Sequence, residues 1–311
     1  MFIKMGVSLG LITWFALRIE LKAAWEITAS IPLAAIIIIF LISIAGQAVC
    51  AYKWRLLSSH FGVKKSTLHY VRMYLIGAFL NNFLPTTVGG DLGRAGIMAR
   101  DENLSYNQAL STVFVERLTG LFILILSSLI GGVYFYNISG NKTVALWSIG
   151  CFIGIVLLSV PLFSSSADKA LKWLPDFVHK FFSYTRIFKE KRPLILIAIL
   201  LSILFYCTEF FIHWGILALL GQKINFMYIV ALVPIVYLVS MLPITINGIG
   251  VRENAYLFFF GFIGLNPEII SSMALVILIL VLAQGLLGGL LLLGYSVKTE
   301  RLNGGKDEST L

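Results

Sequence analysis

The chain has 311 residues, of which 59% are hydrophobic and 13% are charged, and its formal net charge is +9. A soluble domain usually carries about 25% charged residues, so the composition excludes an ordinary soluble enzyme and indicates an integral membrane protein. The three cysteines, Cys50, Cys151 and Cys207, are far apart and form no CxxC motif. We therefore expect neither a disulfide framework nor a metal site, and no cofactor.

Apolar runs occur along most of the chain, and a helix needs about 20 such residues to cross a bilayer. They show no period-two alternation, so we expect helices rather than a barrel. The first run follows Lys4 and resembles a signal peptide. However, Arg18 and Glu20 come after it without a cleavage-site pattern, so we interpret it as a retained helix. The runs are 5–17, 31–52, 68–84, 109–136, 144–163, 193–220, 226–242, 255–265 and 271–293.

Positive charge gathers in two loops and predicts the orientation of the chain. Segment 52–67 carries Lys53, Arg55, Lys64 and Lys65 without an acid, and segment 164–192 is also rich in Lys and Arg. Such loops stay on the cytoplasmic side of a membrane, so the charge does not indicate a nucleic-acid partner. Apolar and basic residues alternate in the second segment, which we interpret as a cytoplasmic amphipathic loop on an anionic leaflet.

Three apolar runs separate these two loops, although an even number of crossings is needed to return to the same side. The first of them runs into Pro85 and Gly90, both unfavourable in a helix. We therefore expect a re-entrant hairpin at about 68–105 that opens to the cytoplasm. The same reasoning predicts a second hairpin, at about 226–266, that opens to the outside.

The predicted fold is an all-α polytopic membrane protein with about six full transmembrane helices and two re-entrant broken-helix hairpins related as an inverted repeat. It forms a single transmembrane domain over 1–295, followed by a disordered cytoplasmic tail over 296–311. Both termini are expected in the cytoplasm, and the protein in the cell membrane.

The two interrupted segments resemble each other in sequence. Leu84–Arg94 aligns without gaps with Leu242–Arg252 in the pattern L-P-x-T-[VI]-x-G-x-x-x-R. Interrupted segments at matching positions of an inverted repeat indicate a midplane binding site in transporters. Irregular backbone at membrane depth must be buried in protein or line a polar cavity. The predicted hinge residues of the broken helices are Pro85, Gly89, Gly90, Pro243, Gly248 and Gly250.

Ionisable side chains at membrane depth are the candidate binding residues. A charge near the bilayer centre costs about 2.5–3.5 kcal/mol, so each needs a partner or a water-filled cavity. Two interpretations stay open. The charges form a packing network of ion pairs, or they line a cavity whose arginines hold a phosphate while carboxylates orient them or meet a cationic headgroup. The candidate substrate-binding residues are Asn82, Asp91, Arg94, Glu116, Arg117, Asn247, Arg252 and Glu253.

Glu209 and His213 also lie at membrane depth, four residues apart on one predicted helix face. That spacing suits half a metal site or a proton relay, but no second pair matches it. A hydrogen bond within the helix is the simpler interpretation.

Three sequence blocks carry the interrupted segments and their charges. In chain order they are Asn81–Pro85 with Gly89–Asp91 and Arg94, then Glu116–Arg117 with Gly120–Leu121, and then Pro243 with Asn247–Glu253. These blocks and their order resemble the lysylphosphatidylglycerol synthetase transmembrane-region family of flippase-like membrane proteins. The resemblance implies a domain similar to the flippase part of the multiple peptide resistance factor. It does not extend to that protein's soluble aminoacyl-transferase domain, so synthetase activity is not implied.

The favoured function is a lipid flippase or lipid-transport protein that holds a headgroup phosphate between Arg94 and Arg252. Its expected partners are membrane lipids of the phospholipid or polyprenyl type. Envelope-biosynthesis enzymes as partners and a homo-oligomer stay open. No P-loop occurs, so ATP is not expected to drive transport directly. Two other functions stay open: an accessory subunit of a lipid or glycan biosynthesis complex, and a membrane-embedded transferase with Asp91 or Glu116 as base.

Overall fold

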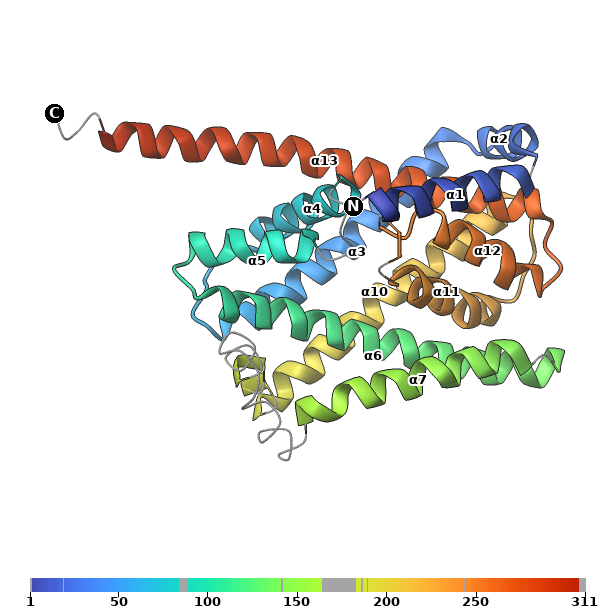
Figure 1. Ribbon diagram of the computed structural model, residues 1–311, viewed down its shortest axis with the longest axis horizontal. Coiled ribbons are helices and arrows are strands. Elements are labelled where there is room, and N and C mark those ends of the chain that lie inside the picture. The colour runs from blue at the N-terminus through green and yellow to red at the C-terminus, as the bar shows by residue number, and fades with distance from the viewer. Residues whose placement is uncertain are drawn as a thin grey trace.

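The computed structural model is helical, and the residues that it describes contain no strand. Four of its helices are long and apolar enough to cross a membrane: α3 (Leu33–Ser59), α6 (Tyr106–Ser139), α10 (Arg192–Leu219) and α13 (Pro267–Asp307). The architecture is thus that of an all-α membrane protein (Figure 1). The described residues are 2–18, 20–83, 89–140, 142–163, 183–185, 187–188, 190–242, 244–245 and 247–307.

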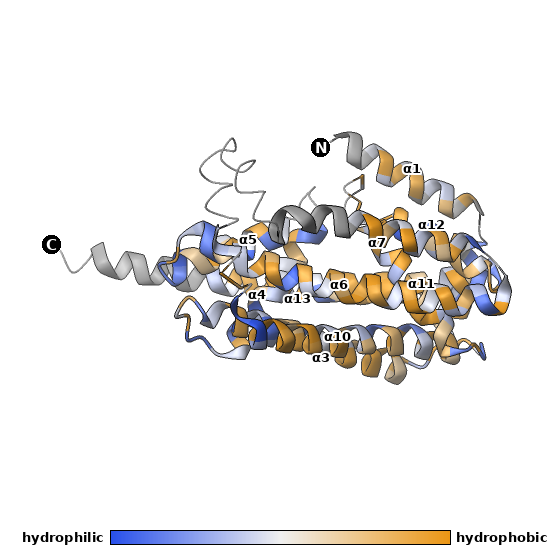
Figure 2. Cartoon of the chain, turned by 90° about the horizontal axis from the view of Figure 1, so that it is seen from below, coloured by the Kyte–Doolittle hydropathy of each residue, from blue (hydrophilic) through white to orange (hydrophobic). Residues whose placement is uncertain are grey.

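Large apolar side chains on the long helices face outward. Leu41 of α3, Leu200 of α10 and Leu290 of α13 are each more than half exposed. Figure 2 shows apolar residues along these helices and hydrophilic residues gathered near the ends of the molecule. A surface of this kind is stable in contact with lipid, whereas in water it would cause aggregation.

Three helices shorter than these four are α1 (Phe2–Arg18), α2 (Leu21–Ala29) and α7 (Lys142–Phe163). Helix α2 lies against α13, where Ser272 Oγ donates to the Ala24 carbonyl at 2.9 Å. The predicted amphipathic loop, 164–192, lies mostly outside the described residues. Helix α13 extends to Asp307, so residues 296–307 are helical where the sequence indicates a disordered tail. No proline interrupts this segment, and a helix already formed adds residues more easily than a new one begins.

Two pairs of shorter helices lie at the interrupted segments. Helix α4 (Thr67–Phe83) packs on α5 (Gly89–Asp101), and α11 (Phe226–Ser240) packs on α12 (Val251–Gly261). In Figure 1 the α5–α6 connection lies at the left end of the molecule, while the α6–α7 and α12–α13 connections lie at the right end. The two pairs therefore open toward opposite ends. That each pair re-enters the membrane stays a prediction.

Left-handed backbone separates α11 from α12. Asn247, Gly248 and Gly250 have φ values of 48°, 75° and 87°. Glycine adopts this conformation without a steric penalty and asparagine tolerates it, but a right-handed helix cannot contain it. The Gly250 N–H donates to Glu253 Oε2 at 2.6 Å, which satisfies a backbone donor at the start of α12. The predicted hinge residue Pro243 lies outside the described residues.

Glycines set the close packing of the first helix pair. A Cβ atom at Gly90 would overlap the backbone carbonyl of Gly77, so only glycine permits this approach of α5 to α4. The Gly90 N–H donates to Asn81 Oδ1 at 2.8 Å. On the other side of α4, a Cβ at Gly288 of α13 would overlap the Leu75 carbonyl. Small residues allow such close approach between membrane helices. The predicted hinge residue Gly89 is the first residue of α5, while Pro85 lies outside the described residues.

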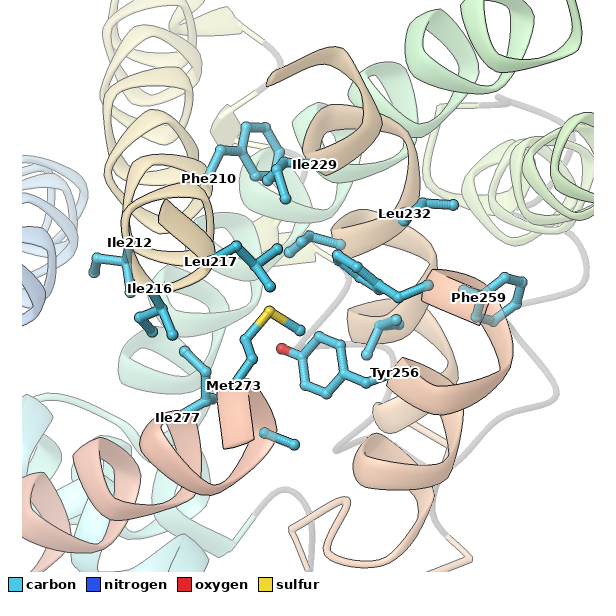
Figure 3. Close-up of a cluster of buried hydrophobic side chains, with 14 of the residues drawn as sticks. Phe210, Ile212, Ile216, Leu217, Ile229, Leu232, Tyr256, Phe259, Met273 and Ile277 are labelled. Carbon is cyan, nitrogen blue, oxygen red and sulfur yellow. The ribbon is translucent and has the colours of Figure 1, made fainter. Parts of the chain in front are cut away.

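The largest apolar cluster lies among α10, α11, α12 and α13 (Figure 3). Leu217, Tyr256 and Met273 are fully buried in it. This cluster fixes the second helix pair against the long helices, and thereby positions the start of α12.

The opposed helix pairs lead to a topological prediction. Because a re-entrant pair returns the chain to the face from which it came, cysteines at positions 64 and 103 should lie on the same side of the membrane, and a cysteine at 266 on the other. We propose to introduce Lys64→Cys, Asn103→Cys and Asn266→Cys singly into a chain without its native cysteines. Intact cells are then labelled with an impermeant maleimide.

Only the cysteine at position 266 should react from outside. If the cysteines at 64 and 103 were labelled from opposite sides, then α4 and α5 together would cross the membrane and the re-entrant hairpin would be wrong.

Candidate functional site

A cluster of charged side chains is buried where α3, α5 and α6 meet. Lys53, Arg94 and Glu116 are each no more than 2% exposed. Glu116 lies between the two cations: Lys53 Nζ is 3.1 Å from Oε1, and Arg94 Nη2 is 2.7 Å from Oε2. Lys53 Nζ also donates to the Glu116 carbonyl and to Ser202 Oγ of α10, both at 3.0 Å. Glu116 therefore joins α3 and α5 to α6.

The Arg94 guanidinium is held between two aromatic rings. Its Cζ lies 4.6 Å from the ring centre of Trp54 and 4.2 Å from that of Tyr74, which are cation–π distances. Trp54 Nε1 donates to Thr112 Oγ1 at 2.9 Å, and this bond orients the Trp54 ring. Arg94 Nε donates to Asp91 Oδ1 at 3.1 Å. Arg94 Nη1 is buried and has no hydrogen-bond partner among the described residues, so one charged donor is unsatisfied.

Arg117 forms the more exposed side of this cluster. Its Nε and Nη2 donate to the two oxygens of Asp91 at 2.9 and 2.8 Å, in the bidentate geometry that arginine makes with carboxylates. The Arg117 side chain is 50% exposed, while that of Asp91 is 13% exposed. Asp91 lies in the first turn of α5, where the helix dipole favours a negative charge.

These five side chains line one cavity of about 150 Å³. The cluster contains three cations, Lys53, Arg94 and Arg117, and two acids, Asp91 and Glu116. Its formal charge is therefore 3 − 2 = +1. A cavity with one excess positive charge and an unsatisfied guanidinium donor is chemically suited to an anion.

A second cavity, of about 260 Å³, adjoins the first and shares Gln47, Phe205 and Met241 with it. Arg252 of α12 and Glu209 of α10 line this second cavity. Most of its other polar lining groups are uncharged hydroxyls and amides. They include Ser43, Tyr237, Ser240, Asn247 and Gln284.

Arg252 and Glu253 lie in the first turn of α12 and are 8% and 6% exposed. Arg252 Nε and Nη2 are each 3.3 Å from Glu253 Oε1, so the two neighbouring side chains neutralise each other. The other Glu253 oxygen accepts from the Gly250 N–H. Glu253 therefore both starts α12 and holds Arg252 at the wall of the second cavity.

The two interrupted segments touch each other. Asn247 Nδ2, in the break before α12, donates to Asn82 Oδ1 at the end of α4 at 2.5 Å. Asn82 Nδ2 donates in turn to the Val281 carbonyl of α13 at 3.0 Å. These side-chain amide hydrogen bonds join the two helix pairs to each other and to α13, beside the two cavities.

The structure thus distributes the predicted residues between two neighbouring groups. Asp91, Arg94, Glu116 and Arg117 form one cluster, Arg252 and Glu253 form a pair at the second cavity, and Asn82 and Asn247 join the segments that carry them. Arg94 and Arg252 do not line the same cavity, so the structure does not place them on two sides of a single phosphate.

Sequence reasoning missed Lys53, which it assigned to the basic cytoplasmic loop 52–67. The structure places Lys53 inside α3 and buries it against Glu116, because the helix continues to Ser59 without interruption. One signal indicated that a further cation lies at membrane depth, although it did not single out Lys53. The predicted membrane-depth residues comprise three arginines and four carboxylates, so the set lacked one cation.

The Glu209–His213 hydrogen bond within α10 is present, but it involves the main chain. His213 Nδ1 lies 2.7 Å from the Glu209 carbonyl oxygen, whereas the Glu209 carboxylate accepts from Tyr237 Oη at 2.5 Å. Within the described residues, no group of three or more His, Cys, Asp and Glu side chains is placed to hold a metal ion.

The two acids of the cluster should differ in their importance for stability. Breaking a buried ion pair costs about 3–5 kcal/mol, and Glu116→Gln removes the acid shared by Lys53 and Arg94. Asp91→Asn should lower the free energy of unfolding by less, because Glu116 still pairs with Arg94, and because Arg117 is half exposed. Thermal unfolding of the purified proteins in one detergent should give the lower Tm for Glu116→Gln. An equal or higher Tm than for Asp91→Asn would contradict the assignment of Glu116 as the bridge.

Comparison with known proteins identifies the family. Residues 1–289 match the family described as the lysylphosphatidylglycerol synthase TM region. A UPF0104 membrane protein of Methanocaldococcus jannaschii is 22% identical over 265 residues, which cover 77% of this chain and 78% of that protein. A UPF0104 membrane protein of Archaeoglobus fulgidus is 24% identical, over 77% of this chain and 80% of that protein. No solved structure matches the chain. The chain is therefore a membrane protein that belongs to the lysylphosphatidylglycerol synthase transmembrane-region family.

Proposed function

We propose that this protein is an integral membrane lipid flippase or lipid-transport protein that binds a phosphate-bearing headgroup at the Lys53–Arg94–Arg117 cluster. The observation that supports this most strongly is the excess of one positive charge around a cavity beside the contact between the two broken helix pairs. Membership of a family described by a lipid synthase's transmembrane region favours a lipid as the cargo.

The depth of Arg117 supports a ligand or water at this place. Helix α6 has 34 residues and is about 50 Å long at about 1.5 Å per residue, and Arg117 lies about 16 Å along it. A hydrocarbon core about 30 Å thick that is centred on α6 therefore includes Arg117. A half-exposed guanidinium at that depth is costly in lipid. An aqueous cavity that admits an anionic headgroup removes this cost.

The hydrogen bonds within the cluster indicate how it could bind a phosphate. A phosphate oxygen accepts from the free Nη1 of Arg94, and other oxygens compete with Asp91 for the two donors of Arg117. Lys53 stays fixed by Glu116 and Ser202 and contributes charge rather than a mobile donor. A phosphate with one negative charge then neutralises the cluster.

Transport follows from the opposed helix pairs. One pair opens toward each end of the molecule, and the first cavity shares three lining residues with the cavity of Arg252. In the proposed cycle a headgroup passes between the two cavities while its acyl chains stay in the bilayer, and the pairs open alternately. The protein would be multi-pass in the cell membrane, with both termini cytoplasmic, and would transform no substrate chemically.

The Arg117→Gln substitution tests the site without removing a fully buried side chain, because Arg117 is half exposed. Loss of a charge-assisted hydrogen bond costs about 1.5–3 kcal/mol, so the variant should move phospholipids at least about tenfold more slowly. The assay uses liposomes that contain purified protein together with fluorescent phospholipids or a polyprenyl phosphate. An impermeant quencher, added outside, reports how much lipid has moved between the leaflets. Lys22→Gln is the matched control, because Lys22 is a highly exposed cation on α2.

Equal movement in wild type and in folded Arg117→Gln would exclude the cluster as the binding site. If folded wild type moved none of the lipids, the flippase proposal would fail, and an accessory role beside a lipid or glycan enzyme would become the favoured function.

A further inference from the structure

Glu209 is an acid whose charge has no partner in the second cavity. Arg252, the cation of that cavity, pairs with Glu253 at 3.3 Å. Among the described residues no Lys, Arg or His nitrogen forms an ion pair with Glu209, whose carboxylate accepts only the hydroxyl of Tyr237. With Arg252, Glu253 and Glu209 all ionised, this group has a formal charge of 1 − 2 = −1.

An ionised carboxylate without a counter-ion is costly inside a membrane, so Glu209 needs a proton or another cation. A metal ion finds few free ligands here. Gln284 Nε2 already donates to Ser43 Oγ at 2.5 Å, and its Oε1 accepts from Gln47 Nε2 at 3.4 Å. A proton needs only one carboxyl oxygen. Tyr237 Oη donates to Glu209 Oε2, while Oε1 accepts no hydrogen bond from the residues that the structure describes.

A hydrogen bond connects this acid to one helix of the second pair, and the neighbouring His213 contacts the other. Tyr237 Oη of α11 donates to the Glu209 carboxylate. One turn along α10, His213 Nε2 lies 2.6 Å from Tyr256 Oη of α12, and the rings of His213 and Tyr237 are 5.7 Å apart. Figure 3 shows Tyr256 among apolar side chains of the largest buried cluster. A change in the charge of Glu209 therefore acts on α11 through Tyr237, and on α12 through Arg252, which lines the same cavity.

The surroundings of Glu209 contain few charges. Arg252 is the cation that faces it from α12, and Tyr237, Tyr256 and His213 are the titratable groups of α11, α12 and α10. Helices α3 and α13 contribute uncharged groups to the cavity. These are Ser43, Gln47 and Gln284.

We propose that the Glu209 carboxyl is a proton-binding site that couples lipid movement to a transmembrane proton gradient; this inference rests on the proposed lipid transport. The proton comes from water in the second cavity and binds a carboxylate oxygen. A neutral acid is a weaker acceptor than a carboxylate, so the bond from Tyr237 weakens. When the proton leaves to water on the other side, the restored negative charge attracts Arg252 away from Glu253. The start of α12 thereby responds to each proton bound and released.

The experiment measures how a pH difference distributes lipid between leaflets. Liposomes with purified protein and a fluorescent phospholipid are prepared with equal pH on both sides or with a difference of about one unit. One proton per lipid permits up to about tenfold accumulation in one leaflet at that difference. Wild type should show accumulation of several fold, and Glu209→Gln should bring the ratio between leaflets back to about one. Glu26→Gln, which removes an exposed carboxylate of α2, is the matched control and should behave as wild type.

Glu209→Asp is the second variant, because it keeps an ionisable carboxyl and should retain part of the response. The inference is overturned if wild type moves lipid equally with and without the gradient, if Glu209→Gln keeps the accumulation, or if a sodium gradient drives it instead. Absence of any lipid movement in folded wild type is a different result, because it removes the proposed function together with this inference.

Discussion

The ion pair between Arg94 and Glu116 is the interaction on which the rest of the site depends. At 2.7 Å, and with both side chains almost fully buried, it connects the short helix α5 to the long helix α6. The second carboxylate oxygen of Glu116 pairs with Lys53, and this pair connects α3 to α5 and α6. A buried charge is tolerated only when it is paired, so these helices cannot separate without exposing a charge to lipid. The same pairing leaves one positive charge in excess at the cavity.

The interrupted helices follow from the same constraint. A continuous helix in place of α4 and α5 would satisfy its own backbone but would carry Asp91 and Arg94 past the position of Glu116. The break lets α5 return beside α4, with the Gly90 backbone against Gly77. The hydrogen bond from the Asn247 amide to Asn82 then joins this break to the second one. Backbone irregularity and charge are thus concentrated in one protected region, as is required of polar groups at membrane depth.

Much of this arrangement could be predicted from sequence, because it depends on residues with strong preferences for a backbone conformation or a polar environment. Glycines and prolines inside apolar runs marked both interruptions, and arginines and acids at membrane depth marked the cluster. Lys53 could not be placed in the same way, because its burial depends on a partner 63 positions away. The division of Arg94 and Arg252 between two cavities also depends on how α3 and α10 pack between them, and no local pattern encodes that. Glu209 was recognised as unusual, but its bond to Tyr237 joins separate helices and is visible only in the fold.

Binding of a phosphate at the cluster is measured by the equilibrium affinity of the protein for a phosphate-bearing lipid. A short-chain phosphatidylglycerol is titrated into purified protein in detergent and compared with a diacylglycerol of the same chain length, for wild type and for Arg117→Gln. Wild type should prefer the phosphate-bearing lipid, and the substitution should reduce this preference by about tenfold or more. A wild-type protein that binds both lipids equally, or a variant that keeps the full preference, would contradict it.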